Sequence, residues 1–407
     1  MLYRIAKIIC KYCIQIYYGK IEVNGLDQLP TDTPMLLACN HPTGFLEPII
    51  IACILDRPLH FITRGDLFAN KLLGPLLRGT NQIPIYRFKD GYAELKKNND
   101  SIQAAEKALK GGGALLMFVE GKTEDIKMLK PLQKGMARIS ASLHKQGLTH
   151  CIVPVGVNFI DTVTFRSKVM LNFGTAIDPH SIIRKQDDER QFFKEINTVI
   201  SEKMKAMMLH VADRSLHPLH DKLIDIYQAT LRHDFLPRID FNRNSFPNYK
   251  KVGSFLAAAS HEEIKQIESE LPSLDHKARH LLRKGHRSFY NYAMLILLGP
   301  IALLGVVVNA MPVFLGYLTE RTLVKSREFV APIRFSASMG FGLLWYGLLT
   351  ILGLRTFGAW GLLVLLGPML GQCSLYWLHL YMAVSKKYRL VDKSVDRLVA
   401  IFTLSKK

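Results

Sequence analysis

The sequence has few cysteines, and the six it has are scattered among apolar segments rather than spaced as pairs. Cys10 and Cys13 form a C-x-x-C sequence, but no second pair and no nearby histidine completes a set of zinc ligands. This pattern excludes a disulfide-stabilised scaffold and favours buried thiols in a reducing compartment. Neither a metal site nor a resident cofactor is predicted.

Two catalytic signatures are also missing. The chain contains no G-x-S-x-G sequence, which disfavours a serine lipase. Gly121-Lys122-Thr123 is similar to the end of a nucleotide-binding P-loop, but that loop requires a glycine at position 116, where this chain has leucine. A nucleoside triphosphatase is therefore excluded.

Acidic residues are scarce as well: 34 Asp and Glu stand against 53 Lys and Arg, a formal net charge of +19. Nucleic acid and anionic lipid are the two common partners of a basic protein. The sequence has no zinc-finger spacing, RNP-type aromatic pattern or helix-turn-helix signal. Because residues 292–384 are almost wholly apolar, we expect membrane phospholipids as partners and no nucleic acid.

Residues 1–20 have the pattern of an amphipathic helix. Arg4, Lys7, Lys11 and Gln15 recur at spacings of three or four residues and share one stripe, while isoleucines occupy the other side. Such a helix can lie in the headgroup layer with its cations outward. The alternative is an ordinary amphipathic helix packed on its own domain.

Residues 21–215 alternate short apolar runs with amphipathic stretches. The alternation predicts an α/β domain, in which helices flank a central, mostly parallel sheet and ligands bind beyond the carboxyl ends of the strands. Strands are expected at 35–39, 60–64, 82–86, 114–120, 151–159 and 168–173, and helices at 45–55, 65–77, 101–110 and 134–144.

The polar region 216–287 predicts a helical connector. His276 and His280 are one helical turn apart and could bind a metal, but no carboxylate or cysteine joins them in a recognisable pattern. His286 follows without completing such a set. We therefore expect these histidines on a solvated helix face.

Residues 288–384 hold three apolar blocks, which predict a C-terminal α-helical membrane module. The blocks 335–354 and 357–384 are each long enough to span the hydrocarbon core. Prolines interrupt the block 292–318, which is also long enough to span once, but a kinked or re-entrant hairpin agrees better with the positions of the basic segments. This arrangement places the basic segments around Arg321 and in the tail 385–407 on the same side as the soluble domain. The expectation is an integral membrane protein with its catalytic domain on the cytoplasmic face.

The segment around His41 carries the clearest chemistry. A predicted strand ends at Cys39, so His41 falls in the loop at its carboxyl end, and Glu47 lies in the first turns of the next helix. A histidine can take a proton from an alcohol, and a carboxylate at its other ring nitrogen fixes the tautomer and stabilises the imidazolium. The alternative is a capping histidine beside a lipid-facing glutamate.

Cations follow the other predicted strands. Guanidinium groups bind phosphate bidentately, lysine acts as a point charge, and a glycine lets backbone N–H groups approach an anion. Several such groups at one edge of a sheet suit a phosphate monoester. The candidate substrate-binding residues are Arg64, Arg87, Glu120, Gly121, Lys122, Lys130, Lys134 and Arg138.

These segments together resemble four motifs of the glycerolipid acyltransferase family, which includes glycerol-3-phosphate and lysophosphatidate acyltransferases. Asn40-His41 with Glu47-Pro48 is similar to the first motif, and residues 79–87 to the second. Residues 118–121 are similar to the third motif and residues 153–155 to the fourth. The four stand in the family's order over about residues 20–210.

The resemblance implies that His41 is the base that deprotonates the acceptor hydroxyl and that Glu47 is its acidic partner. It also implies that Arg87, with Glu120 and Gly121, binds the phosphate of a glycerol-based acceptor. The donor would be an acyl thioester on coenzyme A or acyl carrier protein, as a co-substrate rather than a bound cofactor.

The sequence departs from the family pattern at two places. The family usually has an aspartate five residues after the histidine, where this chain has Leu46 followed by Glu47. One extra residue turns a carboxylate about 100° around a helix, so a longer loop before the helix and the longer glutamate side chain must restore the contact. In the third motif Val119 replaces the usual proline, and Lys122-Thr123 replaces Thr-Arg. The alternative function is a catalytically silent lipid-binding or scaffold protein on the same fold.

Overall fold

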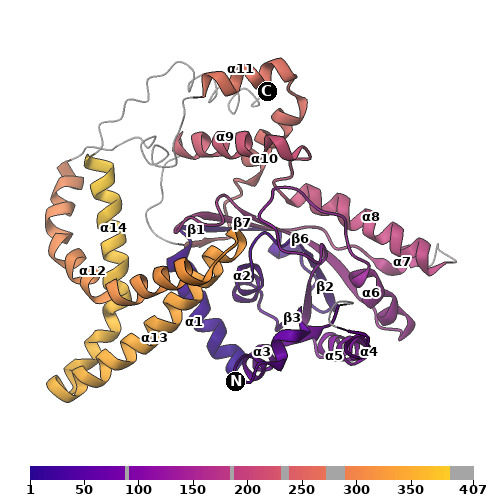
Figure 1. Ribbon diagram of the computed structural model, residues 1–407, viewed down its shortest axis with the longest axis horizontal. Helices are drawn as coiled ribbons and strands as arrows, with labels where there is room; N and C mark the ends of the chain where they lie inside the picture. The colour runs from indigo at the N-terminus through magenta and orange to yellow at the C-terminus, as the bar shows by residue number, and fades with distance from the viewer. Residues whose placement is uncertain (88–90, 184–187, 231–237, 272–288, 386–407) are drawn as a thin grey trace. The chain divides into compact units, whose positions relative to one another are not determined.

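The computed structural model describes residues 1–87, 91–183, 188–230, 238–271 and 289–385 (Figure 1). They divide into two compact units. The sheet unit contains residues 1–162, 167–210 and 239–244, and the helical unit contains residues 163–166, 211–238 and those from 245 onward. His276, His280, His286 and nearly all of the basic tail lie outside the described residues.

One sheet organises the sheet unit, with the strand order β4-β3-β5-β2-β6-β7-β1-β8. The five strands from β4 to β6 are parallel, whereas β7 is antiparallel to β6. This mostly parallel sheet confirms the predicted fold class. The strands are β1 (Lys20–Asn24), β2 (Met35–Cys39), β3 (Leu59–Arg64), β4 (Gln82–Ile85), β5 (Ala114–Phe118), β6 (Cys151–Phe159), β7 (Lys168–Phe173) and β8 (Arg238–Asp240).

Helices flank the sheet, as Figure 1 shows. Every residue of β2 and β6 is buried, as expected of central parallel strands covered on both faces. One core joins these strands to α5, α6 and α8, while α2 packs with α1. The helices are α1 (Leu2–Tyr17), α2 (Leu46–Ile54), α3 (Leu73–Gly79), α4 (Tyr92–Lys96), α5 (Asn98–Lys110), α6 (Gly135–Lys145), α7 (Pro179–Ile183) and α8 (Glu189–Met207).

The helix expected over residues 65–77 is wrong. The segment forms a short 3₁₀ turn at Gly65–Ala69 and then the separate helix α3. The reason is Asn70, whose side-chain oxygen accepts hydrogen bonds from the backbone N–H groups of Leu72 and Leu73. Asparagine that caps the following backbone in this way competes with a continuous helix.

The outward stripe predicted for α1 is also partly wrong. The Lys7 ammonium donates to the Leu55 carbonyl, and the Cys53 thiol faces the Lys7 carbonyl, so this side of the helix packs on α2. Tyr3 lies on the packed side too, where its hydroxyl accepts from the Leu59 N–H at 3.0 Å. Ile5 and Ile8 are exposed instead.

The helical unit begins with three polar helices, α9 (His217–Thr230), α10 (Phe246–Ala258) and α11 (His261–Glu270). The predicted helical connector therefore has helices over much of its described length. The apolar part follows, with α12 (Phe289–Leu323), α13 (Val330–Phe357), the 3₁₀ segment Gly358–Leu366 and α14 (Gly367–Ser385). By length and composition it holds two stretches that could cross a membrane, Phe289–Leu323 and Arg327–Tyr381, which supports membrane association.

The hairpin expected over residues 292–318 is wrong, because α12 is one continuous helix that bends along its length (Figure 1). Pro312 has no N–H to offer the Val308 carbonyl four residues earlier. The indole N–H of Trp345 in α13 donates to that carbonyl at 2.9 Å. A neighbouring helix thus supplies the hydrogen bond that the proline removes, which is how apolar helices tolerate proline.

Candidate active site

The register of the central strands sets the position of His41. Cys39 at the end of β2 is paired with Phe118 at the end of β5, and two residues later the chain reaches His41. The His41 imidazole stacks on the Phe118 ring, with centroids 3.7 Å apart and planes within 6°. The histidine therefore sits at the carboxyl edge of the sheet, where ligands bind in folds of this class.

Asn40 ties the same loop to the next strand. Its side-chain amide donates to the Val157 carbonyl at 2.9 Å, and its oxygen accepts from the Val157 N–H at 2.8 Å. The side chain thus pairs with β6 much as a strand residue would. Asn40 therefore fixes the start of the loop that carries His41.

Glu47 is fully buried in the first turn of α2. Both the backbone N–H and the hydroxyl of Thr43 donate to its carboxylate, the hydroxyl at 2.8 Å. The Thr43 oxygen also accepts from the Leu46 N–H at 3.3 Å, so one side chain caps the helix and holds the glutamate. Without these donors, a buried carboxylate would be strongly disfavoured.

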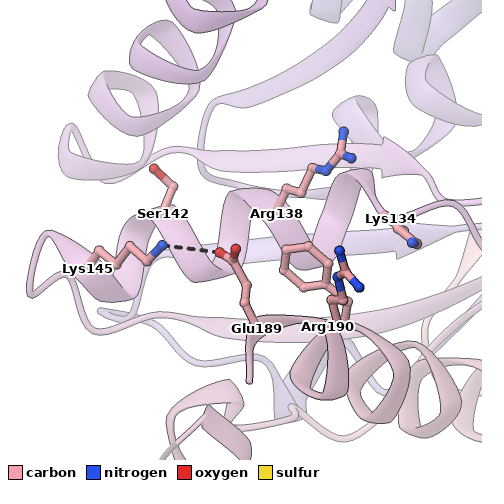
Figure 2. Close-up of a pocket in the computed structure, with 7 residues that line it drawn as sticks. Lys134, Arg138, Ser142, Lys145, Glu189 and Arg190 are labelled. Atoms are coloured by element: carbon pink, nitrogen blue, oxygen red, sulfur yellow. Dashed lines mark hydrogen bonds and ion pairs between the residues drawn. The ribbon is translucent and has the colours of Figure 1, made fainter. Parts of the chain in front are cut away.

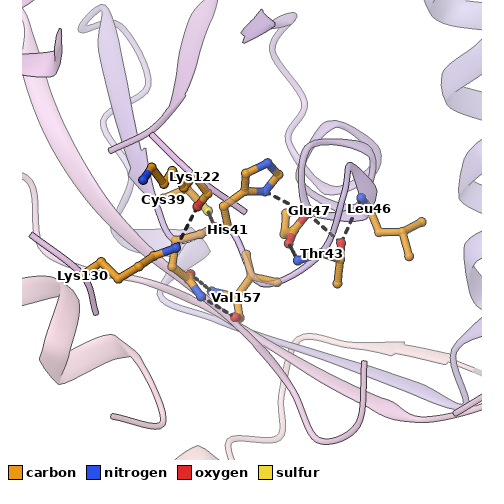
Figure 3. Close-up of polar contacts among 9 residues, drawn as sticks. Cys39, His41, Thr43, Leu46, Glu47, Lys122, Lys130 and Val157 are labelled. Carbon is orange, nitrogen blue, oxygen red and sulfur yellow. Dashed lines mark hydrogen bonds and ion pairs between the residues drawn. The ribbon is translucent and has the colours of Figure 1, made fainter. Parts of the chain in front are cut away.

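The His41 Nδ1 atom lies 3.6 Å from the Glu47 Oε2 atom. Nδ1 is buried and makes no hydrogen bond at this separation, which is longer than an ordinary one. The loop before α2 brings the two side chains together although the acid is one position later than in the family pattern. In Figure 3 the other ring nitrogen points away from Glu47.

Glu120 and Lys130 form the next part of the site. Glu120 is buried directly after β5, and its carboxylate accepts from the Lys130 N–H at 3.2 Å. Burial raises the pKa of Glu120, and the Lys130 charge and backbone donors, including that of His41, oppose the rise. The Lys130 ammonium lies 3.7 Å from Glu120 and 3.5 Å from Glu124 and donates to the Lys122 carbonyl. Lys130 is thus held by acidic groups.

Arg64 and Arg87 follow the adjacent parallel strands β3 and β4 at the same edge of the sheet. Arg64 forms two hydrogen bonds to the Asp66 carboxylate, and Arg87 approaches the same carboxylate at 3.8 Å. Two partly exposed guanidinium groups therefore flank one acid. Guanidinium groups placed in this way can bind a phosphate bidentately.

The remaining candidates lie apart from one another. Gly121 forms the turn after Glu120 with φ +68°, a conformation that favours glycine, and Lys122 beside it is exposed. Lys134 and Arg138 instead line a cavity of about 450 Å³ between α6 and α8 (Figure 2). None of the other candidate residues lines that cavity. Lys134 and Arg138 thus line a different hollow from the one that His41 and Glu47 face.

Sequence reasoning missed Thr43, and it placed Phe118 in the third motif without its contact with His41. A threonine shortly before a helix start often accepts from the first backbone N–H groups, but its spacing of four residues from Glu47 does not match the capping box. The contact with Phe118 depends on the pairing of two strands separated by about 80 residues of chain, which no local pattern reveals. Asn40 was part of the first motif, but its pairing with β6 likewise needs the fold.

The arrangement can perform general base chemistry. A proton on Nδ1 faces the Glu47 carboxylate, which leaves the lone pair of Nε2 available toward the open side. A hydroxyl placed there can lose its proton while the buried carboxylate stabilises the imidazolium. Described groups of histidine, cysteine and acidic side chains form no cluster suited to a metal ion. The fold and site thus define an α/β domain with a histidine–carboxylate pair beside cations.

Comparison with known proteins gives the class of this domain. Residues 20–158, about a third of the chain, match the family model described as Acyltransferase. The resemblance found in the four motifs is thereby confirmed at the level of the family.

Two individual proteins are similar to the chain. A 1-acyl-sn-glycerol-3-phosphate acyltransferase from Bacillus subtilis (strain 168) is 29% identical over 125 residues, which are 30% of this chain and 57% of that protein. The chain thus matches less than two thirds of its relative's length. The crystal structure of the 1-acyl-sn-glycerophosphate (LPA) acyltransferase PlsC from Thermotoga maritima has a TM-score of 0.36 and 16% identity, covering 50% of this chain and 79% of that one.

Proposed function

We propose that this protein is a membrane-bound O-acyltransferase of phospholipid synthesis. It moves a fatty acyl group from an acyl thioester to a hydroxyl of glycerol-3-phosphate or lysophosphatidate. The observation that carries the proposal is the buried Glu47 carboxylate 3.6 Å from Nδ1 of His41, in the region that matches the Acyltransferase family model. The relative from Bacillus subtilis acts, by its name, on a lipid of this kind.

The proposed reaction uses direct attack. Nε2 of His41 takes the proton of the acceptor hydroxyl as that oxygen attacks the thioester carbonyl carbon. The carbon–sulfur bond then breaks, and the leaving thiolate takes the proton from the His41 imidazolium. The products are an ester and a free thiol, so no covalent acyl-enzyme and no resident cofactor is needed.

Arg64 and Arg87 are the proposed ligands of the acceptor phosphate. Arg64 ends β3 and Arg87 follows β4 at the His41 edge, and both guanidinium groups contact the Asp66 carboxylate. Binding the phosphate fixes which hydroxyl of the acceptor reaches the base, and such positioning is a large part of the catalysis expected here.

Membrane attachment is proposed through two surfaces. The first is the apolar module α12–α14. The second lies on the sheet unit itself, where α1 approaches α3 so closely that a Cβ at Gly79 would meet the Leu2 side chain at 2.6 Å. Large apolar side chains stand exposed on these two helices, as on an interfacial helix: Met1, Leu2, Ile5, Ile8, Tyr12, Leu72, Leu73 and Leu76. We place this unit on the cytoplasmic face.

A catalytically silent lipid-binding or scaffold protein is the second candidate. The 3.6 Å separation between His41 and Glu47, beyond hydrogen-bond length, is the observation that favours it. The test uses purified full-length protein in nanodiscs with radiolabelled palmitoyl thioester and either glycerol-3-phosphate or lysophosphatidate. Labelled lysophosphatidate or phosphatidate supports the enzyme and identifies the acceptor. Saturable lipid binding without product with either acceptor, from coenzyme A or carrier-protein thioester, supports the scaffold.

A further inference from the structure

A cationic hollow between α6 and α8 is distinct from the His41 edge. Its residues come from one face of α6, at spacings of three or four residues, and from the first turns of α8 (Figure 2). The cavity holds about 450 Å³, within the range of small-molecule sites. We call it the α6–α8 hollow, and its lining consists of Lys134, Arg138, Ser142, Lys145, Glu189, Arg190 and Phe193.

The charge of the α6–α8 hollow points to an anion. Four cations line it against one acid, and that acid is Glu189, which pairs with Lys145 at 3.2 Å. Asp188 next to the hollow caps α8 by accepting from the Arg190 N–H. Lys134, Arg138 and the Arg190 guanidinium have no recorded acidic partner among the described side chains. Guanidinium groups on both walls suit a ligand with more than one phosphate.

The lining also contains an aromatic ring. Phe193 is half-buried and packs on the core beneath α6 and α8, with one side in the cavity. An exposed aromatic face beside arginines is the combination on which nucleobases stack. The hydroxyl of Ser142, which donates to Glu106 at 2.9 Å, adds a polar group to the same wall.

The α6–α8 hollow begins next to the catalytic edge. Lys134 follows Gln133, whose N–H donates to the Val119 carbonyl at 2.7 Å, one residue before Glu120. The side chain of Gln133 also lies against Gly121, where a Cβ would meet it at 2.9 Å. A ligand anchored in the hollow can therefore extend a flexible arm toward the site of reaction.

From these observations we infer that the α6–α8 hollow binds the adenosine 3′,5′-bisphosphate end of an acyl-coenzyme A donor. The inference rests on the proposed acyl transfer and chooses between its two donor carriers. Several phosphates, one nucleobase and a long pantetheine arm match the cations, the ring and the position of the hollow. A hollow of about 450 Å³ can hold a nucleotide but not a folded carrier protein.

The test uses full-length protein in nanodiscs and the double variant Arg138→Gln/Arg190→Gln, which removes one cation from each wall. Its matched control is Lys107→Gln/Lys205→Gln, which removes two exposed cations from α5 and from the far end of α8. Lys205 is 15 residues from Arg190, about 22 Å along the helix. Transfer is measured with palmitoyl-coenzyme A and with a palmitoyl-N-acetylcysteamine thioester, which has no nucleotide.

We expect the double variant to raise the KM for palmitoyl-coenzyme A about 10-fold, with no change in the KM for the acceptor or in the rate with the N-acetylcysteamine thioester. The control variant keeps wild-type values. A rise in the acceptor KM would assign the hollow to the acceptor phosphate, and an unchanged KM for palmitoyl-coenzyme A would assign it to neither substrate. Either result overturns the inference.

A binding measurement separates this inference from the proposed function. Isothermal calorimetry with adenosine 3′,5′-bisphosphate should give a dissociation constant that the double variant raises about 10-fold and the control leaves unchanged. If the nucleotide binds in this way but no donor supports transfer, the proposed function fails and the nucleotide site stands. If transfer occurs from carrier protein alone and the nucleotide does not bind, the function stands and the inference is wrong.

Discussion

Polar side chains lie inside both units of this protein, but their hydrogen bonds differ. Among the apolar helices, the Asn309 amide donates to the Gly305 and Gly367 carbonyls, and its oxygen accepts from the Tyr346 hydroxyl at 2.7 Å. At the edge of the sheet, Nδ1 of His41 is buried and lies 3.6 Å from Glu47 without a hydrogen bond. The Asn309 side chain has its hydrogen-bond partners, whereas Nδ1 of His41 needs a small movement or a bound ligand to gain one.

The difference separates two uses of buried polarity. A fully bonded side chain in an apolar region stabilises one packing arrangement, and removing it leaves a carbonyl without its donor. A ring nitrogen beside a firmly held carboxylate can change its protonation while the surroundings stay fixed, which is what a general base requires. We therefore expect variants at the sheet edge to change catalysis and variants among the apolar helices to change stability.

The largest effect is expected for His41→Ala. Loss of the base should lower kcat about 10²- to 10⁴-fold, because the acceptor hydroxyl then has no group to take its proton. Transfer from palmitoyl thioester in nanodiscs measures this, and near-ultraviolet circular dichroism checks the fold. His261→Gln, at an exposed histidine of α11, is the matched control and should keep full activity. Wild-type turnover by His41→Ala would show that His41 is not the base, and the sheet edge would then lose its catalytic role in the comparison.

A smaller loss is expected for Thr43→Val. The variant keeps the shape of the side chain but removes the hydroxyl that donates to Glu47 at 2.8 Å, so the oxygen that faces His41 loses a donor that positions it. We expect kcat to fall about 10-fold with little change in KM. Thr43→Ser keeps the hydroxyl and should restore most of the rate. If Ser and Val lose activity equally, Thr43 acts through packing rather than by positioning Glu47.

Local patterns in the sequence predicted much of the sheet. The runs at 35–39, 151–159 and 168–173 have the bounds of β2, β6 and β7, because short, mostly apolar segments between turns leave few alternatives to a buried strand. β1 was missed because Lys20 and Glu22 interrupt its apolar pattern. Glu22 is nevertheless fully buried, since Lys168 lies 2.8 Å from its carboxylate.

The site could be predicted only in part, for the same reason. His41, Glu47 and Glu120 follow strand ends or a helix start that the sequence marks, and the structure brings them to one edge. The assignment of Lys134 and Arg138 to the phosphate stays a prediction, because these residues, at the start of α6 and in its first turns, line the cavity between α6 and α8. The number of residues between a cation and a motif does not predict on which side of a helix that cation lies.

Trp345→Phe tests the structural side of the comparison. It removes the donor to the Val308 carbonyl, which Pro312 already leaves without a helical partner. The cost should be about 1 kcal/mol, the usual net value of one hydrogen bond, seen as a lower thermal midpoint in nanodiscs with acyl transfer unchanged. Trp360→Phe, at a 75% exposed tryptophan in the 3₁₀ segment, is the control and should leave the midpoint unaltered. Equal effects of the two variants would show that loss of the indole, rather than of this hydrogen bond, sets the stability.

His150 provides the smallest and most specific test, because it is a buried histidine whose two nitrogens both have partners. Nε2 lies 2.8 Å from the Ser140 hydroxyl and Nδ1 3.0 Å from the Leu148 carbonyl. Burial lowers the pKa of His150 to about 4, and the neighbouring His180 adds to the effect. By its hydrogen bonds this histidine belongs with Asn309 rather than with His41.

The contribution of His150 to the free energy of unfolding should fall as the pH falls. Above about pH 6.5 His150 is neutral in both the folded and unfolded states. As the pH falls from about 6.5 to about 4, the unfolded chain binds a proton that the folded protein does not, so the free energy of unfolding falls. His150→Gln should therefore flatten the decline of the thermal midpoint between pH 7 and pH 5, whereas His261→Gln should keep the wild-type slope. The His150→Gln variant should keep its acyl transfer activity at pH 7. Loss of that activity would mean that His150, although fully hydrogen-bonded, takes part in the chemistry.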